Sequence, residues 1–402
     1  MRILFISRWF PYPPDNGARI RVFSLIKHLS RKHDVELLAF TDGDISSTQS
    51  EVMEQYCRRI HTTPYQEFRP NRLRALLGLF STRPRSMVDT HSRGMRALVE
   101  TVTADQPFDI VLASEIESVP YALLLHGTPM VFEELELAVI FEQFARQRSW
   151  VKRVRYGLTW WKQRHYVRYL LRHVDGCTVV SDPERALLHR VAPDFRPVEI
   201  VPNGVSLERY EGDWGAPVND TLIFHGAMTY WANFEAMEYF LTTVFPLILA
   251  ERPDVVLRIT GRTDGVPLNR LALSKSVVLT GYLEHIEPAV AQSWGCVVPL
   301  LAGGGTRLKI LEAMALGTPV VSTSKGAEGL EVIDGESILL ADEPAEFAGA
   351  VVRLLGDESL RARLACSGRS LVQERYGWDR IGDRLDTFLQ RVVERQREAQ
   401  VR

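Results

Sequence analysis

The sequence predicts an α/β protein with two doubly wound parallel sheets, each in its own domain. Two series of strand, helix and strand support this fold class: Ile3–Ser7, Ala18–Arg31 and Val35–Phe40, then Thr221–His225, Phe234–Leu249 and Val255–Thr260. A helix that connects two short apolar strands is typical of the βαβ units of parallel sheets. With 402 residues, the chain is also long enough for two separate cores.

Composition and charge exclude several classes of protein. The chain is 46% apolar and 24% charged with a net charge of −2, which gives no support for nucleic-acid binding. Its four cysteines are far apart, with no spacing typical of metal ligands: Cys57, Cys177, Cys296 and Cys366. No apolar run approaches the roughly 18 residues of a membrane span. We therefore expect reduced thiols and a cytoplasmic location, with peripheral attachment to the inner face of a membrane left open.

In the first domain, the loop Arg8–Gly17 follows the first strand. Ligands of doubly wound sheets bind beyond the carboxyl ends of the strands, so Asn16 and Gly17 lie where a diphosphate or an acceptor would bind. The alternative is that residues 13–17, PPDNG, form only a turn. Further strands are predicted at Asp109–Ala113 and Met130–Glu133, and Cys177–Ser181 is predicted as the last strand of this domain. Glu133, Glu134 and Glu136 are then either acceptor contacts or the solvated start of a helix.

Two stretches of the first domain are strongly basic. Residues 58–96 hold nine arginines, and residues 143–174, within a long or broken helix predicted at Phe141–His173, hold nine Lys and Arg and no acid. Trp150, Trp161 and Tyr169 are among the aromatic residues of the second stretch. One interpretation is a solvated cationic helix face. The other, which we favour, is a docking surface for anionic lipid, because cationic groups and interfacial aromatics suit a headgroup layer.

The second domain contains a glycine loop between a strand and a helix. The strand ends near Val298, Gly303, Gly304 and Gly305 follow, and Thr306 is the predicted N-cap of a helix that ends near Leu316. A loop of this kind presents N–H groups and the positive end of the helix dipole, and so favours an anion. Arg307 and Lys309 add positive charge to the predicted anion site.

Glu312 lies on this helix among apolar residues, where a carboxylate is costly to bury unless it has partners. Lys309 is three residues earlier and would be a helix-surface partner. The alternative is that Glu312 accepts hydrogen bonds from the diol of a bound ribose while the loop holds phosphates.

The full run GGGTRLKILEAMALGTPVV resembles the donor-site motif of the GT-B-fold retaining glycosyltransferases, in particular family 4. Other segments match the family in the expected order: Arg2–Ser7, Pro11–Arg19, Val201–Val205, Leu222–Gly226, Gly261 and Thr280–Tyr282. The resemblance implies two Rossmann-like domains facing across a cleft. Residues 1–202 would bind the acceptor, residues 203–376 would bind the donor, and a helix at 377–402 would cross back to the first domain.

The resemblance also implies an activity. A sugar would move from a nucleotide-diphosphate sugar to an acceptor hydroxyl with retention, without a metal or other cofactor, in polysaccharide or glycolipid assembly. The acceptor would be a sugar or a lipid-linked glycan. Gly17 would approach the donor phosphates, Tyr282 and Leu283 would contact the nucleobase, and Asn203-Gly204 would be a hinge.

The chain departs from the family at two places. The first of the usual two glutamates is replaced by Gly304, and no arginine or lysine follows Gly226. We expect Arg307, Lys309 and Arg262 to supply the missing phosphate contacts. Two alternatives stay open: a nucleotide-sugar epimerase of the same fold, and a catalytically silent subunit that binds the nucleotide sugar.

Overall fold

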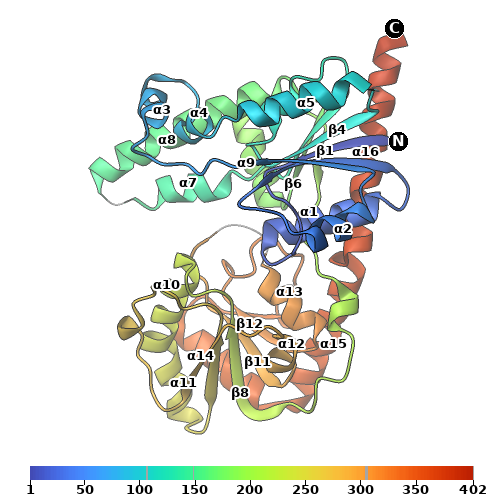
Figure 1. The fold of residues 1–402 in the computed structure, drawn as a ribbon. Helices are drawn as coiled ribbons and strands as arrows, with labels where there is room; N and C mark the ends of the chain where they lie inside the picture. The colour runs from blue at the N-terminus through green and yellow to red at the C-terminus, as the bar shows by residue number, and fades with distance from the viewer. Residues whose placement is uncertain (106, 148, 304–306, 402) are drawn as a thin grey trace. The chain divides into compact units, whose positions relative to one another are not determined.

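The computed structural model describes residues 1–105, 107–147, 149–303 and 307–401 (Figure 1). The chain forms two compact units. Unit 1 contains Met1–Pro202 and Ile381–Arg402, and unit 2 contains Asn203–Arg380. Each unit is built around one parallel sheet, of seven and six strands respectively, which confirms the predicted fold class.

The sheet of unit 1 has the strand order β3-β2-β1-β4-β5-β6-β7, and every pair of neighbours is parallel. Its strands are β1 (Arg2–Ser7), β2 (Asp34–Thr41), β3 (Arg59–Pro64), β4 (Ile110–Ser114), β5 (Met130–Glu133), β6 (Gly176–Val179) and β7 (Val198–Ile200). Ile3, Leu4 and Phe5 of β1 are all fully buried. Burial of successive residues means that both faces of the sheet are covered, as parallel sheets require.

Helices cover both faces of this sheet, and Figure 1 shows α5 on one side and α1 on the other. The helical segments of unit 1 are α1 (Gly17–Leu29), α2 (Ser47–Glu54), α3 (Leu73–Leu77), η1 (Gly78–Phe80), α4 (Arg85–Asp89), α5 (Arg93–Asp105), α6 (Val119–Ala122), α7 (Ala138–Ala145), α8 (Trp150–Leu171), α9 (Asp182–Val191) and the C-terminal α16 (Trp378–Val401). The stretch predicted as one long or broken helix is therefore the broken pair α7 and α8.

Two strands of unit 1, β3 and β7, were not predicted from the sequence. The prediction that Cys177–Ser181 is the last strand was wrong, because β7 follows β6 and pairs with it in parallel. This strand has only three residues and stands between Pro197 and Pro202, so it shows no period that a pattern could detect. The edge strand β3 has the polar sequence RIHTTP, which carries no hydrophobic alternation.

The sheet of unit 2 has the order β10-β9-β8-β11-β12-β13, again with parallel neighbours. Its strands are β8 (Val218–His225), β9 (Val256–Thr260), β10 (Val277–Gly281), β11 (Ser293–Val298), β12 (Val320–Ser322) and β13 (Leu339–Leu340). The helical segments are η2 (Leu207–Tyr210), α10 (Trp231–Tyr239), η3 (Phe240–Val244), α11 (Phe245–Glu251), η4 (Leu268–Arg270), α12 (Glu287–Ala291), α13 (Leu308–Ala315), α14 (Pro344–Gly356) and α15 (Glu358–Arg375).

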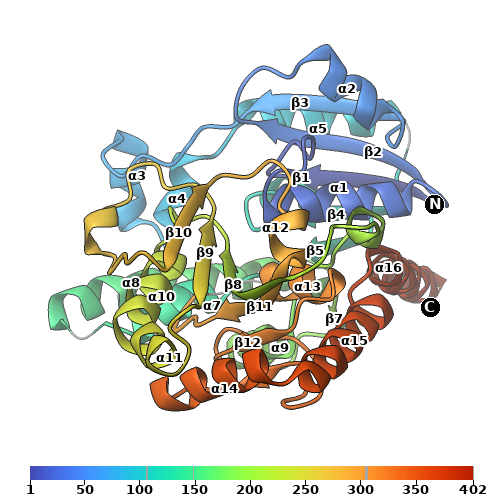
Figure 2. The ribbon, with the colours of Figure 1, turned by 90° about the horizontal axis from the view of Figure 1, so that it is seen from below.

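Alternate residues of β8 point into two different cores. Leu222 and Phe224 pack in the core with α10, α11 and α14, whereas Ile223 packs in the core with α12 and α13. Figure 2 shows α10 and α11 on one side of the sheet and α12 and α13 on the other. This alternation follows from the two-residue period of a strand that is buried on both faces.

The C-terminal helix α16 belongs to unit 1 from Ile381 onward. Phe388 and Leu389 are buried, and a Cβ atom on Gly176 of β6 would lie 2.9 Å from Cζ of Phe388. The helix thus completes the core of unit 1 with residues far away in the sequence. Within the described ranges, no helix is long and apolar enough to span a membrane.

Candidate functional site

The candidate site lies at the carboxyl edge of the unit 2 sheet. The chain leaves β8 for β9 on one side, and β11 lies on the other, so the topological switch point is between β8 and β11. Ligands of open α/β sheets bind in the crevice at such a point. His225 ends β8, Gly261 follows β9, Tyr282 follows β10, and the loop to α13 follows β11. Four adjacent strands therefore bring the predicted donor residues to one edge.

Two glycines allow the backbones at this edge to approach one another. Gly226 has a φ of 141° and Gly261 a φ of 127°, which favours glycine. A Cβ atom on Gly261 would lie 2.3 Å from the carbonyl oxygen of Gly226. A Cβ atom on Gly226 would lie 3.1 Å from Nζ of Lys309. Glycine at 261 allows the backbone at Gly226 to come close, and glycine at 226 leaves space for the ammonium of Lys309.

Lys309 extends from α13 to the end of β8. Its Nζ donates a hydrogen bond of 2.7 Å to Oδ1 of Asn233 and lies 4.1 Å from the ring centroid of Phe224. Burial lowers the pKa of Lys309 to about 7. The partner of this ammonium is thus Asn233, and the interpretation of Lys309 as the helix-surface partner of Glu312 was wrong.

Glu312 is held by two side chains from other parts of unit 2. Its Oε1 accepts a hydrogen bond of 3.1 Å from the hydroxyl of Tyr210, and its Oε2 accepts one of 3.2 Å from Nε2 of His225. Burial alone would raise the pKa of Glu312, but the hydrogen bond and the charge of His225 outweigh it, and the pKa is lowered. The carboxylate is ionised and fixed in orientation, with 22% of the side chain exposed.

His225 is the buried base of this pair. Burial disfavours its charged form, but hydrogen bonds to Cys296 and Glu312 raise the pKa to about 9. Its Nδ1 lies 3.8 Å from Sγ of Cys296, one of four cysteines that are all free thiols. At neutral pH the protein therefore holds an imidazolium against the carboxylate of Glu312.

Neither partner of Glu312 was predicted from the sequence. Tyr210 lies between the predicted hinge at Asn203-Gly204 and β8, where no element was predicted, but it is 6% exposed and ends the short helix η2. His225 was assigned to a strand with no role. A polar residue at the last position of an otherwise apolar strand, directly before a glycine, was the available signal, because that position faces the ligand edge of a parallel sheet.

Arg307 is buried directly before α13, with 5% exposure. Its Nη2 donates to the carbonyl oxygens of Gly303, at 2.7 Å, and Lys325, at 3.0 Å. The side chain therefore fixes the start of the loop and joins it to the segment after β12. The described helix begins at Leu308. Gly304, Gly305 and Thr306, predicted as phosphate contacts and N-cap, lie outside the described residues.

The residues predicted to contact the nucleobase are at the neighbouring strand ends. Tyr282 is 65% exposed, and the guanidinium of Arg262 lies 5.6 Å from its ring centroid. Leu283 is half-buried beside Tyr282. An exposed ring with a cation above it offers a flat face for a base, with phosphate-compatible charge next to it.

In unit 1, Asn16 and Gly17 form the start of α1. Oδ1 of Asn16 accepts a hydrogen bond of 3.1 Å from the backbone N–H of Arg19, so Asn16 is the N-cap of the helix. The guanidinium of Arg19 forms ion pairs with Asp15, at 3.0 Å, and Asp42, at 3.4 Å. The charge of Arg19 is therefore partly neutralised within this loop.

Glu133 is fully buried at the end of β5, so the interpretation of this residue as the solvated start of a helix was wrong. It accepts hydrogen bonds from Nε of Arg21, at 2.7 Å, and from the hydroxyl of Ser114, at 2.7 Å. Arg21 also donates to the carbonyl oxygen of Pro202, at 3.1 Å, where the chain leaves unit 1.

In the described ranges, no group of three His, Cys, Asp or Glu side chains is arranged to hold a metal ion.

Comparisons with known proteins agree with this architecture. Residues 16–204 match the family model described as glycosyl transferase 4-like domain, and residues 219–357 match the model described as glycosyl transferases group 1. An uncharacterized 44.6 kDa protein in the cps region of Klebsiella pneumoniae is 22% identical over 93% of this chain and 96% of its own length. A phosphatidyl-myo-inositol mannosyltransferase of Mycobacterium leprae is 29% identical over 46% of this chain and 51% of that enzyme.

Solved structures are similar over almost the full chain. Sucrose-phosphate synthase from Thermosynechococcus elongatus has a TM-score of 0.68 and 18% identity, covering 98% of this chain and 99% of that one. HepE of Anabaena in complex with UDP has a TM-score of 0.68 and 16% identity, covering 97% and 100%. At these identities the likeness shows the fold. Because the two family models match both units of the chain, the protein belongs to the GT-B-fold glycosyltransferases that resemble family 4.

Proposed function

We propose that the protein moves a sugar from a nucleotide-diphosphate sugar to an acceptor hydroxyl with retention, and that it needs no metal ion. The observation that carries the proposal is the ionised carboxylate of Glu312, held by Tyr210 and His225 at the switch point of unit 2. A fixed carboxylate with one exposed side suits the two hydroxyls of a ribose, whose O–H groups need acceptors.

In this proposal, the diphosphate of the donor binds at the start of α13. The positive end of the helix and the ammonium of Lys309 stabilise negative charge there. A bound diphosphate also raises the lowered pKa of Lys309, because a nearby anion favours the charged form. The base stacks on Tyr282, and Arg262 lies beside the phosphates. Arg307 acts by holding the loop at Gly303.

The transfer step needs little covalent chemistry from the protein. The acceptor oxygen forms a bond to the anomeric carbon while the bond from that carbon to the β-phosphate oxygen breaks. The proton of the acceptor hydroxyl passes to the departing phosphate, on the same face of the sugar, which gives retention. Most of the rate enhancement then comes from orientation and from charge stabilisation of the nucleoside diphosphate.

The relatives suggest a class of donor and acceptor. HepE of Anabaena was crystallised with UDP and with UDP-glucose, and the relative from Mycobacterium leprae is named for mannosyl transfer to phosphatidyl-myo-inositol. Their names favour a nucleotide hexose as donor and a glycolipid or polysaccharide as acceptor for this chain too.

The test is turnover of UDP-glucose and GDP-mannose, followed by NMR of the anomeric proton of the first product. We expect slow release of the nucleoside diphosphate with water as acceptor, and an α-configured product from an α-configured donor. A β-configured product contradicts retention. Nucleotide binding without any turnover favours the silent subunit, and a new sugar nucleotide in place of free nucleoside diphosphate favours the epimerase.

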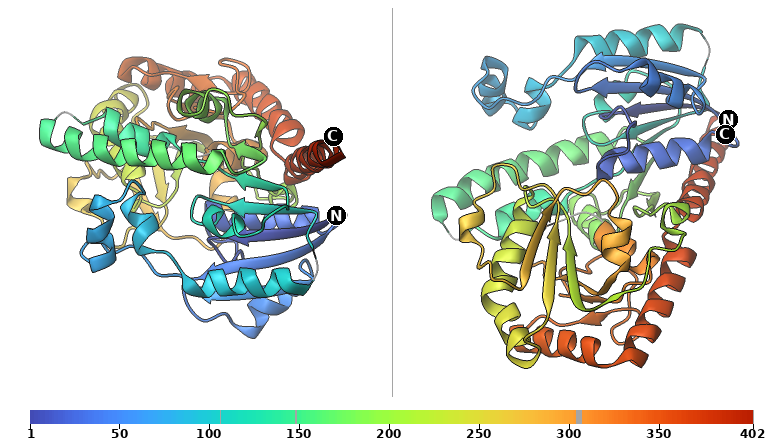
Figure 3. Two further views of the ribbon diagram at one scale, coloured as in Figure 1. Left: turned by 90° about the horizontal axis from the view of Figure 1, so that it is seen from above. Right: turned by 60° about the horizontal axis from the view of Figure 1, so that its bottom comes forward.

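We further propose that unit 1 docks on an anionic membrane. Leu77 of α3 and Phe80 of η1 are 58% and 92% exposed, and Trp150 of α8 is 77% exposed. Nζ of Lys162 in α8 donates to the carbonyl oxygens of Gly78, at 2.9 Å, and Leu79, at 2.8 Å, and so joins the two segments. Figure 3 shows the light-blue α3–α4 segment near the green α8. Exposed apolar side chains among basic residues suit a headgroup layer.

Sedimentation with vesicles tests this docking. Wild type is expected to bind vesicles that contain phosphatidylglycerol and not vesicles of phosphatidylcholine alone, because each basic residue near an anionic surface contributes about 1 kcal/mol. The double variant Leu77→Glu and Phe80→Glu is expected to stay in the supernatant. Leu273→Glu, at an exposed apolar residue of unit 2, is the control. Equal sedimentation of all three proteins contradicts the docking surface.

A further inference from the structure

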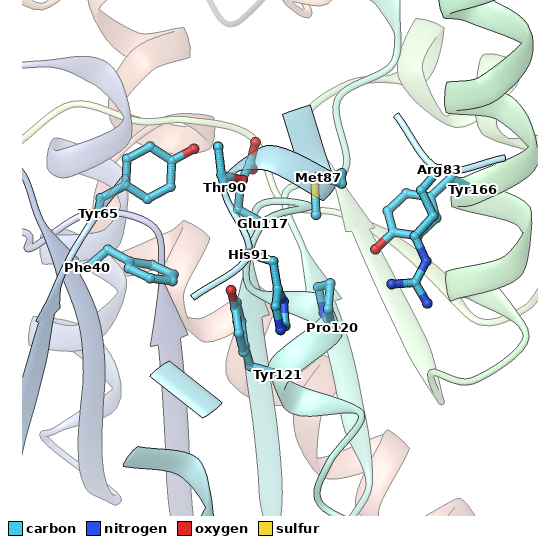
Figure 4. A pocket seen from close by; sticks show the side chains of 10 residues that line it. All are labelled: Phe40, Tyr65, Arg83, Met87, Thr90, His91, Glu117, Pro120, Tyr121 and Tyr166. Carbon is cyan, nitrogen blue, oxygen red and sulfur yellow. The ribbon is translucent and has the colours of Figure 1, made fainter. Parts of the chain in front are cut away.

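Both sheets carry aromatic rings near their carboxyl edges, and the two groups of rings differ in exposure. In unit 1, Phe40, Tyr65 and Tyr121 pack around a cavity of about 20 Å³ (Figure 4). A cavity of this size has room for about one water molecule. In unit 2, Tyr230 and Trp231 follow β8 and are 39% and 41% exposed. The rings of unit 2 are therefore accessible to a larger ligand.

The loop between β8 and α10 holds these two rings on a fixed backbone. Met228 is 1% exposed, and its N–H donates a hydrogen bond of 2.9 Å to the carbonyl oxygen of Arg262. Nδ2 of Asn233 donates a hydrogen bond of 2.8 Å to the carbonyl oxygen of Ala227. Because the loop is anchored in this way, a ligand that packs on its rings orders little additional backbone.

The same loop has no charged side chain. Residues 226–234, GAMTYWANF, contain no Lys, Arg, Asp or Glu, whereas the family usually has an arginine and a lysine after the position of Gly226. The ammonium of Lys309 reaches the loop from α13 and donates a hydrogen bond of 2.7 Å to Asn233. Positive charge for the donor phosphates thus comes from α13, and the loop itself offers uncharged groups and aromatic faces.

The two rings lie next to the start of the glycine loop. Gly303 has a φ of 100°, and a Cβ atom on it would lie 2.9 Å from Oη of Tyr230 and 3.1 Å from Cβ of Ala232. The ring centroids of Tyr230 and Trp231 are 5.9 Å apart, with an angle of 59° between the rings. Since the diphosphate is proposed to bind at the start of α13, the rings border the place of the sugar that the β-phosphate carries.

We propose that Tyr230 and Trp231 form a platform for the sugar of the donor, on which the C–H face of a hexopyranose packs against Trp231. The face of an aromatic ring is negative, and the C–H groups of a pyranose are weakly positive. The proposal names residues that select the donor sugar and rests on the glycosyl transfer proposed above. In this chain, a loop without cations then contributes to sugar binding in place of phosphate binding.

Calorimetry with paired ligands tests the platform. Each pair is a nucleoside diphosphate and its sugar derivative, UDP with UDP-glucose and GDP with GDP-mannose, and the pair that binds wild type is used. We expect Trp231→Leu to bind the sugar nucleotide about fivefold more weakly than wild type, because the aromatic contact to the sugar is lost. Its affinity for the nucleoside diphosphate should equal that of wild type. Trp231→Phe keeps a ring and should recover most of the lost affinity.

Two further variants serve as references. Tyr282→Leu removes the proposed contact to the nucleobase and should weaken binding of both ligands of the pair by the same factor. Phe68→Leu, at an aromatic residue of unit 1 that is 40% exposed, should bind both ligands as wild type does.

The proposal is overturned if Trp231→Leu and wild type bind the sugar nucleotide equally, or if Trp231→Leu loses the same factor for both ligands of the pair. Failure of wild type to bind any of the four ligands would refute the donor site itself. Release of the nucleoside diphosphate is followed on the same wild-type sample. Loss of sugar-nucleotide affinity in Trp231→Leu, together with no turnover by wild type, would support the platform and refute the proposed transfer alone.

Discussion

At the scale of single residues, Glu312 takes its orientation from two donors that the chain brings from distant positions. Tyr210 precedes β8, and His225 ends it. Tyr210 donates a hydrogen bond to one oxygen of the carboxylate, and His225 donates one to the other. The positions of Glu312 and Lys309 were predictable from a local motif. Tyr210 was not, because its contact depends on the path of a linker that has no periodic pattern.

Tyr210→Phe keeps the ring and removes only the hydroxyl. The carboxylate of Glu312 then loses a donor, and a hydrogen bond to a charged group is worth about 1.5 kcal/mol or more. We expect the affinity for the nucleoside diphosphate to fall about tenfold in calorimetry. The control is Tyr239→Phe, which removes a hydroxyl from α10 instead of η2. This variant should bind the nucleoside diphosphate as wild type does. Equal affinities in Tyr210→Phe and wild type would show that this hydroxyl has no part in the site.

The charge of His225 makes the stability of the protein depend on pH. The pKa in the folded protein, about 9, is higher than the ordinary 6.5, so the protonated form stabilises the fold. This contribution is fully present below pH 6.5 and is lost as the pH rises through 9. His225→Gln keeps a hydrogen-bond donor but cannot carry the charge.

We therefore expect wild type to exceed His225→Gln in free energy of unfolding by on the order of 2 kcal/mol at pH 6. The difference should shrink between pH 6.5 and pH 9.5, as measured by urea unfolding. Lys309 titrates in both proteins, so its contribution cancels in the comparison. A difference that stays constant over this range, or grows, would mean that the imidazole is neutral in the folded protein.

At the scale of elements, one buried guanidinium joins Gly303, before α13, to the segment after β12. Arg307 precedes α13 and bonds to the carbonyl oxygens of Gly303 and Lys325. Its type and position were predictable from the motif, but the direction of its side chain was not. A basic residue after a glycine loop suggests a phosphate contact, whereas the burial of this side chain depends on the tertiary position of Lys325.

Arg307→Ala removes both of these hydrogen bonds and leaves the carbonyl oxygens of Gly303 and Lys325 without this donor. Each loss costs about 1 kcal/mol or more. We expect a lower melting temperature and a nucleotide affinity reduced at least about tenfold, since the loop is no longer fixed. Arg363→Ala, at an exposed arginine of α15, is the control in the thermal-shift assay. Nucleotide affinity equal to that of wild type would contradict any role of Arg307 in donor binding.

Elements with a strong period were predicted to within a few residues, and weak ones were missed. The strand at Met130–Glu133 agrees with β5 at both ends, because its four residues are all buried. The helix predicted at Phe234–Leu249 is longer, from Trp231 to Glu251, and contains the π-helical turn η3. A π-helical turn inserts about one extra residue into the helix, and this single shift in the spacing of the apolar residues is too small to identify in the sequence.

At the scale of the whole molecule, residues from the end of the chain complete the core of unit 1. α16 buries Leu385, Phe388 and Leu389, and Oδ1 of Asp386 lies 2.7 Å from Nε2 of His33, within hydrogen-bond distance. The return of this helix could be predicted only from the family resemblance. Its amphipathic pattern shows that one face is buried, but the pattern does not show which unit covers that face.

Phe388→Ala is expected to destabilise unit 1, because the ring is 1% exposed and packs against Gly176 of β6. Removal of a buried phenylalanine ring costs about 3–5 kcal/mol through lost burial and the cavity left behind. Urea unfolding followed by circular dichroism measures the loss. Thr387→Ala, at the exposed neighbour, should change little. A loss below about 1 kcal/mol for Phe388→Ala would mean that α16 is not part of this core.

The most direct test of the account is calorimetric titration of wild type, Glu312→Gln and Glu374→Gln with UDP, GDP and ADP. Glu374 is an exposed carboxylate of α15 and is the matched control. We expect one of the three nucleotides to bind wild type and Glu374→Gln alike, and to bind Glu312→Gln at least about tenfold more weakly, because the ribose loses a charged acceptor. Equal binding of that nucleotide to all three proteins would contradict the assignment of the donor site to Glu312 and the carboxyl edge of unit 2.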